Sequence, residues 1–409
     1  MASSATDRAA TFPIASGSAH RERTGGRRPL RIGIDISRTI GQRTGVGSYA
    51  SRLVEGLAAV DRENEYLLYP YFWECFHPEW RTARIPESPQ FRLWCEDRTL
   101  EEINQRWTTA PADEVVGGVD VLHSTAFTVP PPLSEAKLVV TVPDLTFLTH
   151  PELHTEANRS FCLRQADLWS KRAAYLITLS ESARSDILRY LSFPEERVVA
   201  IPLAAAPEFV PSTDLGAVRR VLASHDIRDN YVLFVGTLEP RKNAITLLRA
   251  CADVLRVADP PHLLVLAGAS GWMNSEVFAE VRALQLEERV RFLGYVPDAD
   301  LQALYTAARV FVYPSLYEGF GLPVIEAMAC GAPVITSTTS SLPEVAGDAA
   351  LLVPPTDVIA LRGALEEVLN SHAKRLQMRA ASRRQAERFS WQETARKTLA
   401  VYRKAVDEA

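Results

Sequence analysis

Two successive series of short apolar runs, each run followed by a helical pattern, constrain the fold of this 409-residue chain most strongly. The runs are continuous rather than alternating, as in the strands of a parallel sheet that helices cover on both faces. The first series comprises residues 31–36, 119–123, 137–142 and 174–179, and the second comprises residues 231–235, 262–267, 289–293, 309–313 and 332–336. The pattern predicts an α/β protein with two doubly wound, Rossmann-like domains that face a central cleft. Ligands of such sheets bind at the carboxyl ends of the strands.

The stretch between the two series marks the domain boundary. Residues 197–212 contain three prolines and lose the periodicity, so the end of this stretch is expected to be the interdomain linker. We therefore expect an N-terminal domain over residues 29–210 and a C-terminal domain over residues 211–387.

Both ends of the chain fall outside these domains. Residues 388–409 read as a last amphipathic helix, with Ser390 as its N-cap and Glu393 at the capping-box position. The first helix, after residues 31–36, is expected to begin with Ser48 as its N-cap. Residues 1–28 are rich in Ala, Ser, Thr, Gly and Arg and lack the apolar segment of a secretion signal, so a disordered tail is expected.

Composition excludes several classes of protein. The formal net charge is -5, so a nucleic-acid-binding protein is not expected. The five cysteines show no zinc spacing and indicate reduced, buried thiols. No apolar stretch approaches the roughly 20 residues that span a bilayer. We therefore expect a cytoplasmic enzyme.

The segment 313–331 (YPSLYEGFGLPVIEAMACG) carries the sharpest functional signal. It begins where a strand is expected to end, and Gly319 and Gly321 allow a tight turn that a ligand can approach closely. Pro323 suits the first turn of a helix and Gly331 the position just past its end. A helix N-terminus with free backbone N–H groups is thus expected here, and such an end binds anions.

Two acids flank this turn, Glu318 before the helix and Glu326 inside it. With seven residues between them, they resemble the Glu-x7-Glu motif of retaining GT-B glycosyltransferases, in particular of glycosyltransferase family 4. The resemblance covers most of the chain from about residue 31 and includes the last helix, which in GT-B enzymes crosses back onto the first domain. It implies that Glu318 contacts the transferred sugar and that Glu326 binds the nucleotide ribose. The turn between them, Gly319, Phe320, Gly321 and Leu322, would meet the sugar and the diphosphate.

A second motif, FVGTLEPRKN at residues 234–243, also follows a strand. Gly236 opens a turn there, and Arg241 and Lys242 stand just before the next helix, where two cations complement a diphosphate. The family resemblance implies that both bind the donor diphosphate and neutralise the leaving group. Many members carry an additional Arg where this chain has Thr237, so Arg241 is expected to supply the missing charge. Val296, in a later turn, is implied to lie near the base.

The N-terminal half offers weaker candidates. Gly45 and Gly47 resemble the glycine loop that faces the donor phosphates in the family. His123 stands at a strand end where the family keeps a His that touches the transferred sugar. Asp144 follows another strand, but Pro143 replaces the His that often precedes this Asp, so one polar contact is expected to be missing.

Residues 159–175 interleave basic residues with apolar ones. They are consistent with a surface that contacts anionic membrane from the cytoplasmic side, and equally with an ordinary helix whose apolar side lies in the core.

The resemblance implies transfer of a hexose from a nucleotide diphosphate sugar, with retention of configuration and without a metal. The EPRKN and YEGFGLP segments resemble bacterial mannosyltransferases of envelope polysaccharides, which favours mannose from GDP-mannose and a glycan or lipid-linked glycan acceptor. UDP-sugars stay open as donors. A nucleotide-sugar epimerase of the same architecture and a non-catalytic scaffold are the alternatives. A dinucleotide dehydrogenase would need G-x-G-x-x-G after a strand, which the chain lacks.

Overall fold

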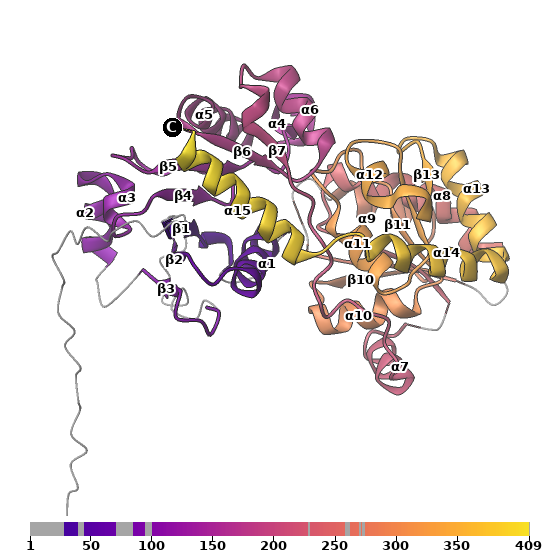
Figure 1. Ribbon diagram of the computed structural model, residues 1–409. Helices are drawn as coiled ribbons and strands as arrows, with labels where there is room; N and C mark the ends of the chain where they lie inside the picture. Colours follow the sequence, from indigo (N-terminus) through magenta and orange to yellow (C-terminus); the bar gives the residue numbers. More distant parts are fainter. Residues whose placement is uncertain are drawn as a thin grey trace, which may run out of the picture.

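The computed structural model describes residues 28–39, 45–70, 85–94, 100–227, 230–257, 262–269, 271 and 275–408. Within them the chain forms two parallel sheets that lie side by side, each packed with helices (Figure 1). The first sheet has the strand order β3-β2-β1-β4-β5-β6-β7 and the second the order β10-β9-β8-β11-β12-β13. The order reverses beside β1 and beside β8, and these switch points are where doubly wound sheets bind ligands.

The first sheet holds the N-terminal elements. Its strands are β1 (Arg31–Asp35), β2 (Glu65–Tyr69), β3 (Phe91–Leu93), β4 (Val121–Ser124), β5 (Lys137–Thr141), β6 (Tyr175–Thr178) and β7 (Val198–Ala200). Its helices are η1 (Ser37–Thr39), α1 (Gly45–Val60), α2 (Leu100–Thr109), α3 (Ala112–Val115), α4 (Thr146–Thr149), η4 (Pro151–Leu153), α5 (Glu156–Arg172), α6 (Glu181–Tyr190) and η5 (Glu195–Arg197).

The second sheet is built from the C-terminal half. Its strands are β8 (Tyr231–Val235), β9 (Leu263–Ala267), β10 (Val290–Gly294), β11 (Val310–Tyr313), β12 (Val334–Ser337) and β13 (Ala350–Val353). Its helices are α7 (Leu215–Ser224), η6 (Pro240–Lys242), α8 (Ala244–Val257), α9 (Ser275–Ala283), α10 (Asp298–Ala307), α11 (Leu322–Ala329), α12 (Leu342–Ala346), η7 (Gly347–Ala349), α13 (Val358–Asn370) and α14 (His372–Ala386).

The last helix, α15 (Trp391–Asp407), returns from the second sheet and packs across the first, mainly against α1 (Figure 1). The Ser390 hydroxyl accepts a hydrogen bond from the Glu393 backbone N–H, which confirms the expected N-cap. Helix α1 comes so close that a Cβ on its Gly56 would lie 2.8 Å from the backbone oxygen of Trp391. The returning helix therefore depends on a residue without a side chain.

All nine apolar runs form strands, and four further strands escape the sequence pattern. β3 and β7 have three residues each, β13 is half-exposed, and β2 begins with an exposed Glu. No helix or strand lies between β7 and α7, where the linker is expected. The expectation of Ser48 as an N-cap is wrong, because α1 already begins at Gly45.

Other expectations concern the tail, the thiols and the membrane. Residues 1–27 of the expected tail, and Cys75 and Cys95, lie outside the described residues. Cys162, Cys251 and Cys330 are buried free thiols, as expected. None of the helices that the structure describes combines the length and the apolar character that a membrane-spanning helix requires.

The contact between α1 and α15 can be tested with a pair of glycine substitutions. In Gly56→Ala the new methyl would meet backbone at 2.8 Å, so we expect a loss of about 1–3 kcal/mol in stability from overpacking. In Gly363→Ala, on α13, nothing lies within 4 Å of the new methyl, so the helix should gain up to about 1 kcal/mol. Urea unfolding followed by circular dichroism measures both, and equal stability of the two variants would contradict the packing.

Candidate functional site

A cleft of about 560 Å³ opens between the carboxyl ends of the two sheets. Its size is typical of small-molecule sites, and residues of both sheets line it. The cleft brings together most of the residues that the sequence predicts for the site: Gly45, Asp144, Gly236, Arg241, Lys242, Val296, Glu318, Gly319, Phe320, Gly321, Leu322 and Glu326.

The turn from Gly319 to Gly321 (hereafter the glycine turn) follows β11 and caps α11. Gly321 has φ +102°, in the left-handed region that favours glycine, and Pro323 follows in the first turn of α11. A Cβ on Gly319 would lie 2.4 Å from the backbone oxygen of Pro143, which belongs to the other half of the cleft. The glycine turn can therefore press directly against the loop that follows β5.

The glycine turn also presents unused hydrogen-bond donors. Among the residues that the structure describes, none accepts a hydrogen bond from the backbone N–H of Gly319, Phe320 or Gly321. These groups stand at the N-terminus of α11, where the helix dipole adds positive potential. The arrangement can bind an anionic group from the cleft.

Beside the glycine turn lies a buried group of charges, formed by Glu239, Arg241, Lys242 and Glu318 (hereafter the ion cluster). Arg241 donates to Glu318 at 2.6 Å and to Glu239 at 2.7 Å. The Lys242 ammonium donates to Glu318 and to the Tyr313 hydroxyl, both at 2.6 Å. Two cations thus face two carboxylates, and the loops after β8 and β11 are joined through them.

Burial and the oppositely charged neighbours shift the pKa values of these groups in opposite directions. Burial alone would raise the pKa of Glu318, but Arg241 and Lys242 hold that pKa at about 2. Burial opposes the charge of Arg241 as well, yet Glu318 and Glu239 raise its pKa above its usual value. Burial and repulsion from Arg241 lower the pKa of Lys242, so its ammonium depends on Glu318. Arg241 and Lys242 thus stabilise the Glu318 carboxylate, and Glu318 in turn stabilises both cations.

Glu326 lies in the second turn of α11 and behaves differently. It is half-buried, and the Tyr305 hydroxyl donates to it at 3.2 Å. Burial, followed by repulsion from Asp298, raises the pKa of Glu326 to about 8. No cation is hydrogen-bonded to it among the described residues. This carboxyl group is therefore largely protonated at neutral pH.

Two of the predicted site residues do not line the cleft. His123 is fully buried, with Nδ1 at 2.6 Å from the Tyr402 hydroxyl of α15 and Nε2 at 2.8 Å from the Thr141 hydroxyl. Gly47 is needed for packing, because a Cβ there would lie 2.0 Å from the backbone oxygen of Arg38. His123 thus joins β4 to β5 and α15, and Gly47 lets α1 approach η1 closely.

Several residues that set the hydrogen bonds and pKa values of the site are not predicted from the sequence. Glu239 accepts a hydrogen bond from Arg241, and the Tyr313 hydroxyl accepts one from Lys242. Tyr305 donates to Glu326, and Asp298 helps to raise the pKa of Glu326. Glu239 and Tyr313 stand within the two motifs, so their place at strand ends was an available signal. Tyr305 and Asp298 come from α10, and only the folded chain brings them to α11.

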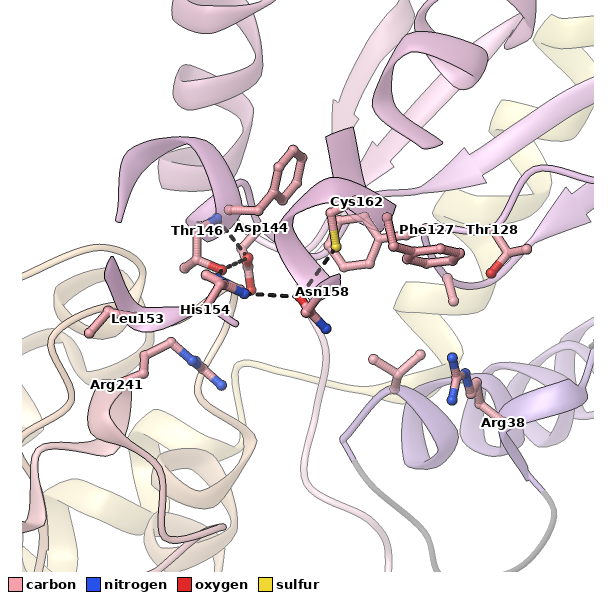
Figure 2. Close-up of a pocket in the computed structure, with 14 residues that line it drawn as sticks. Arg38, Phe127, Thr128, Asp144, Thr146, Leu153, His154, Asn158, Cys162 and Arg241 are labelled. Atoms are coloured by element: carbon pink, nitrogen blue, oxygen red, sulfur yellow. Dashed lines mark hydrogen bonds between the residues drawn. The ribbon is translucent and has the colours of Figure 1, made fainter. Parts of the chain in front are cut away.

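A second, smaller pocket of about 250 Å³ (hereafter the side pocket) adjoins the cleft (Figure 2). It shares Val46, Asp144 and Arg241 with the cleft. Its lining residues are Arg38, Val46, Ala126, Phe127, Thr128, Asp144, Thr146, Phe147, Leu153, His154, Asn158, Phe161, Cys162 and Arg241.

The described part of the chain contains no cluster of three or more His, Cys, Asp or Glu that could hold a metal ion. Asp298 and Asp300 are spaced as Asp-x-Asp in the first turn of α10, and an Asp300 carboxylate oxygen lies 3.5 Å from His225 Nε2. The expectation of a metal-independent reaction stays a prediction.

Comparisons with known proteins identify relatives that cover most of this chain. The sequence model described as "Glycosyl transferases group 1" matches residues 222–385. The O-antigen chain mannosyltransferase B of Escherichia coli is 33% identical over 380 residues, which cover 88% of this chain and 96% of that protein. The serotype-specific mannosyltransferase WbdA of Escherichia coli is 32% identical over 285 residues, 67% of this chain but only 34% of that longer protein.

Solved structures support the fold. Sucrose-phosphate synthase from Thermosynechococcus elongatus superimposes with a TM-score of 0.72 at 23% identity, covering 94% of this chain and 100% of that one. HepE of Anabaena, in complex with UDP and glucose, gives a TM-score of 0.70 at 18% identity, covering 92% and 100%. This likeness confirms the GT-B fold that the resemblance implies.

Removing one charge from the ion cluster should be costly. Glu318→Gln leaves two buried cations short of a partner, and we expect it to destabilise the protein by about 3–5 kcal/mol at neutral pH. Because the folded-state pKa of Glu318 is depressed to about 2, its stabilisation is complete above the unfolded value of 4.5 and is lost as the pH falls toward 2. The gap in urea stability between wild type and variant should shrink over that range.

The control is Glu280→Gln, which removes an ion pair with the exposed Arg249 and should cost less than about 1 kcal/mol. Equal effects of the two substitutions would show that the ion cluster is no more than a surface salt bridge in energy.

Proposed function

Because the chain belongs to the group 1 glycosyl transferases, we propose that it transfers a mannosyl residue from GDP-mannose to a glycan or lipid-linked glycan, with retention of the anomeric configuration. The observation that carries this proposal is the cleft itself. There the ion cluster and the free N–H groups of the glycine turn stand side by side, facing Glu326.

The donor fits this arrangement in one orientation. The diphosphate would lie between the glycine turn and the cations Arg241 and Lys242, because the free N–H donors of the turn and both cations meet there. The sugar would lie against Glu318, which accepts hydrogen bonds from its hydroxyl groups. The ribose would bind Glu326, and the base would lie beyond it near Val296, which also lines the cleft.

The proposed reaction breaks one bond of the donor and forms one bond to the acceptor. The bond between the anomeric carbon and the phosphate oxygen breaks, and both electrons leave with the nucleoside diphosphate. The acceptor oxygen forms its bond to the same face of the oxocarbenium-like sugar, and its proton passes to the departing phosphate. Arg241, Lys242 and the glycine turn would stabilise the negative charge that develops on the leaving group. We name no covalent nucleophile, because Glu318 and Glu326 both serve the donor.

The names of the relatives support mannose and a glycan acceptor. The two Escherichia coli relatives are mannosyltransferases, one of them of the O-antigen chain. HepE holds UDP and glucose, so UDP-sugars stay open as donors. An epimerase or a scaffold of the same fold would not transfer the sugar to another molecule.

A donor panel tests the proposal. Thermal stabilisation is measured in the presence of EDTA with GDP-mannose, UDP-glucose, UDP-N-acetylglucosamine and ADP-glucose, and nucleotide release is followed with each. We expect GDP-mannose to raise the melting temperature most and to lose its nucleotide only slowly to water. Binding of no donor would contradict the proposal, and binding only after a divalent metal is added would contradict the metal-independent mechanism.

Lys242→Ala tests the contact with the diphosphate. The loss of a hydrogen bond to a charged group costs about 1.5–3 kcal/mol, so kcat/KM for GDP-mannose should fall about 10- to 150-fold. Arg249→Ala, on α8 and outside the cleft, is the matched control and should leave the rate unchanged. An unaltered kcat/KM in the folded Lys242→Ala protein would rule out this role.

Glu326 should make donor binding dependent on pH. A carboxylate accepts one ribose hydroxyl at each oxygen, whereas in the protonated acid one oxygen has become a donor, so ribose binding favours loss of the proton. Since the pKa of Glu326 is about 8, the affinity for GDP-mannose should rise by up to about tenfold per pH unit from pH 6 to 8 and level off above. Calorimetry with GDP-mannose measures it. Glu326→Gln should bind more weakly and without this dependence, and a flat profile of the wild type would contradict the ribose contact.

We also propose that the protein lies in the cytoplasm and contacts an anionic membrane. Contacts within the protein leave few side chains of α5 for a membrane-binding surface. In α5, Trp169 is buried, Arg172 donates to two backbone oxygens, and Lys171 is paired with Asp167. Only Arg164 and Leu168 of this helix's basic and apolar residues are left as an exposed pair without such contacts. Flotation with vesicles of anionic lipid at low salt is the test, and a protein that stays unbound would exclude membrane contact.

A further inference from the structure

Four buried polar side chains form a continuous row of hydrogen bonds (hereafter the polar row) where α1 and α15 pack on the first sheet (Figure 1). The row runs from Tyr402 of α15 to His123 of β4, then to Thr141 of β5 and Tyr49 of α1. Its three contacts are 2.6, 2.8 and 2.9 Å long. None of the four residues is more than 2% exposed. Of the four, only Tyr49 is also among the residues that line the cleft.

The polar row holds more hydrogens than its contacts can use. Burial lowers the pKa of His123 to about 3, so its imidazole ring is neutral at physiological pH and has a single N–H. Each of the three hydroxyl groups adds one hydrogen. Four hydrogens are thus available for three contacts, and one hydrogen must find an acceptor outside the row.

The position of this spare hydrogen depends on the direction in which the row donates. If Tyr49 donates to Thr141, the spare hydrogen lies on Thr141 or, at the far end of the row, on Tyr402. Both residues are fully buried, and neither hydroxyl has a partner outside the row among the described residues. A buried donor without an acceptor loses its hydration and gains nothing in return. This direction is therefore disfavoured.

Donation in the opposite direction leaves no hydrogen without access to an acceptor. Tyr402 then donates to His123 Nδ1, and the His123 Nε2–H donates to Thr141. Thr141 in turn donates to the Tyr49 hydroxyl, so the spare hydrogen lies on Tyr49, at the end of the row that borders the cleft. Burial raises the pKa of Tyr49 above its usual value, so this hydroxyl stays a donor at physiological pH.

The strand end that holds Tyr49 belongs to the donor side of the cleft. Thr141 is the last residue of β5, and the backbone oxygen of Pro143, two residues later, is the atom against which Gly319 packs. The Tyr49 hydroxyl is thus held at the strand end that meets the glycine turn. A nucleotide sugar offers acceptors for it there, because sugar hydroxyl oxygens and phosphate oxygens both accept hydrogen bonds.

We infer that Tyr49 donates a hydrogen bond to an oxygen of the bound nucleotide sugar, and that Tyr402 and His123 are positioning residues that set the direction of this donation. The inference rests on the proposed function and adds a donor-binding residue to it. It also changes the role expected for His123, which acts through Thr141 and Tyr49 instead of touching the transferred sugar. The last helix, α15, is thereby connected to the cleft.

Tyr49→Phe tests the contact, because it removes the hydroxyl and keeps the ring. Calorimetry with GDP-mannose and with GDP measures both dissociation constants, and we expect the affinity for GDP-mannose to fall about tenfold. A loss for GDP-mannose alone would place the acceptor on the sugar, and an equal loss for GDP would place it on the diphosphate. Unchanged affinity for both ligands would overturn the inference.

The matched control is Tyr66→Phe. It also removes a buried hydroxyl of the first sheet, but Tyr66 is hydrogen-bonded to Asp61 and lies outside the cleft. Both dissociation constants should stay at their wild-type values in this variant.

Tyr402→Phe tests the positioning role, since Tyr402 does not line the cleft. Without its hydrogen the row can donate in either direction, and if half of the molecules donate the wrong way, GDP-mannose binds about twofold more weakly. In the Tyr49→Phe background the same substitution should change nothing, because no hydroxyl is left to direct. An equal loss in both backgrounds, or no loss in either, would overturn the positioning role.

The hydrogen on the His123 ring gives a readout that needs no ligand. NMR of the full chain with nitrogen-labelled histidine shows which ring nitrogen carries the hydrogen, and His123→Gln assigns the signal. We expect the hydrogen on Nε2 and none on Nδ1. A hydrogen on Nδ1 would overturn the direction of the polar row.

The outcomes separate this inference from the function on which it rests. If no nucleotide sugar binds the wild-type protein, the proposed function fails and the contact with Tyr49 falls with it. If GDP-mannose binds the wild type and Tyr49→Phe equally well, only the inference is wrong.

Discussion

The buried ion cluster is the interaction on which the rest of the site depends. Three charged side chains from the loop after β8 and one from the loop after β11 meet where water is largely excluded. Removing charges from water is expensive, so the cluster is stable only while each partner is in place. It thereby fixes the spacing between two neighbouring strand ends, and it holds the glycine turn with its free N–H groups next to two cations.

The cleft needs a second constraint, which comes from contacts between the two halves of the chain. Gly319 touches the backbone at Pro143, and α15 returns to pack on α1 at Gly56. Each contact has backbone atoms where any larger residue would place a Cβ, so each selects glycine for close approach. Because Asp144 follows Pro143 directly, the same contact also brings the side pocket against the donor cleft. The packing of the two halves therefore also sets how the two pockets adjoin.

The sequence predicts the strands of both sheets well, because their buried apolar runs follow from local pattern alone. It also locates Glu318, Glu326, Arg241 and Lys242, since glycines and charges at strand ends carry a chemical meaning without the fold. It does not reveal the setting of His123, whose partner Tyr402 lies 279 residues away, or the pKa of Glu326, which depends on residues from α10. The side pocket was beyond reach for the same reason, because its walls come from segments that only tertiary packing brings together.

The proposed function requires a nucleotide sugar to bind in the cleft, with its diphosphate between the glycine turn and the ion cluster. A crystal structure of the protein with the intact donor tests it most directly. We expect phosphate oxygens within hydrogen-bonding distance of the N–H groups of Gly319 to Gly321 and of the Lys242 ammonium, with the ribose hydroxyls on Glu326. Phosphates bound elsewhere, or a ribose turned away from Glu326 toward solvent, would contradict it.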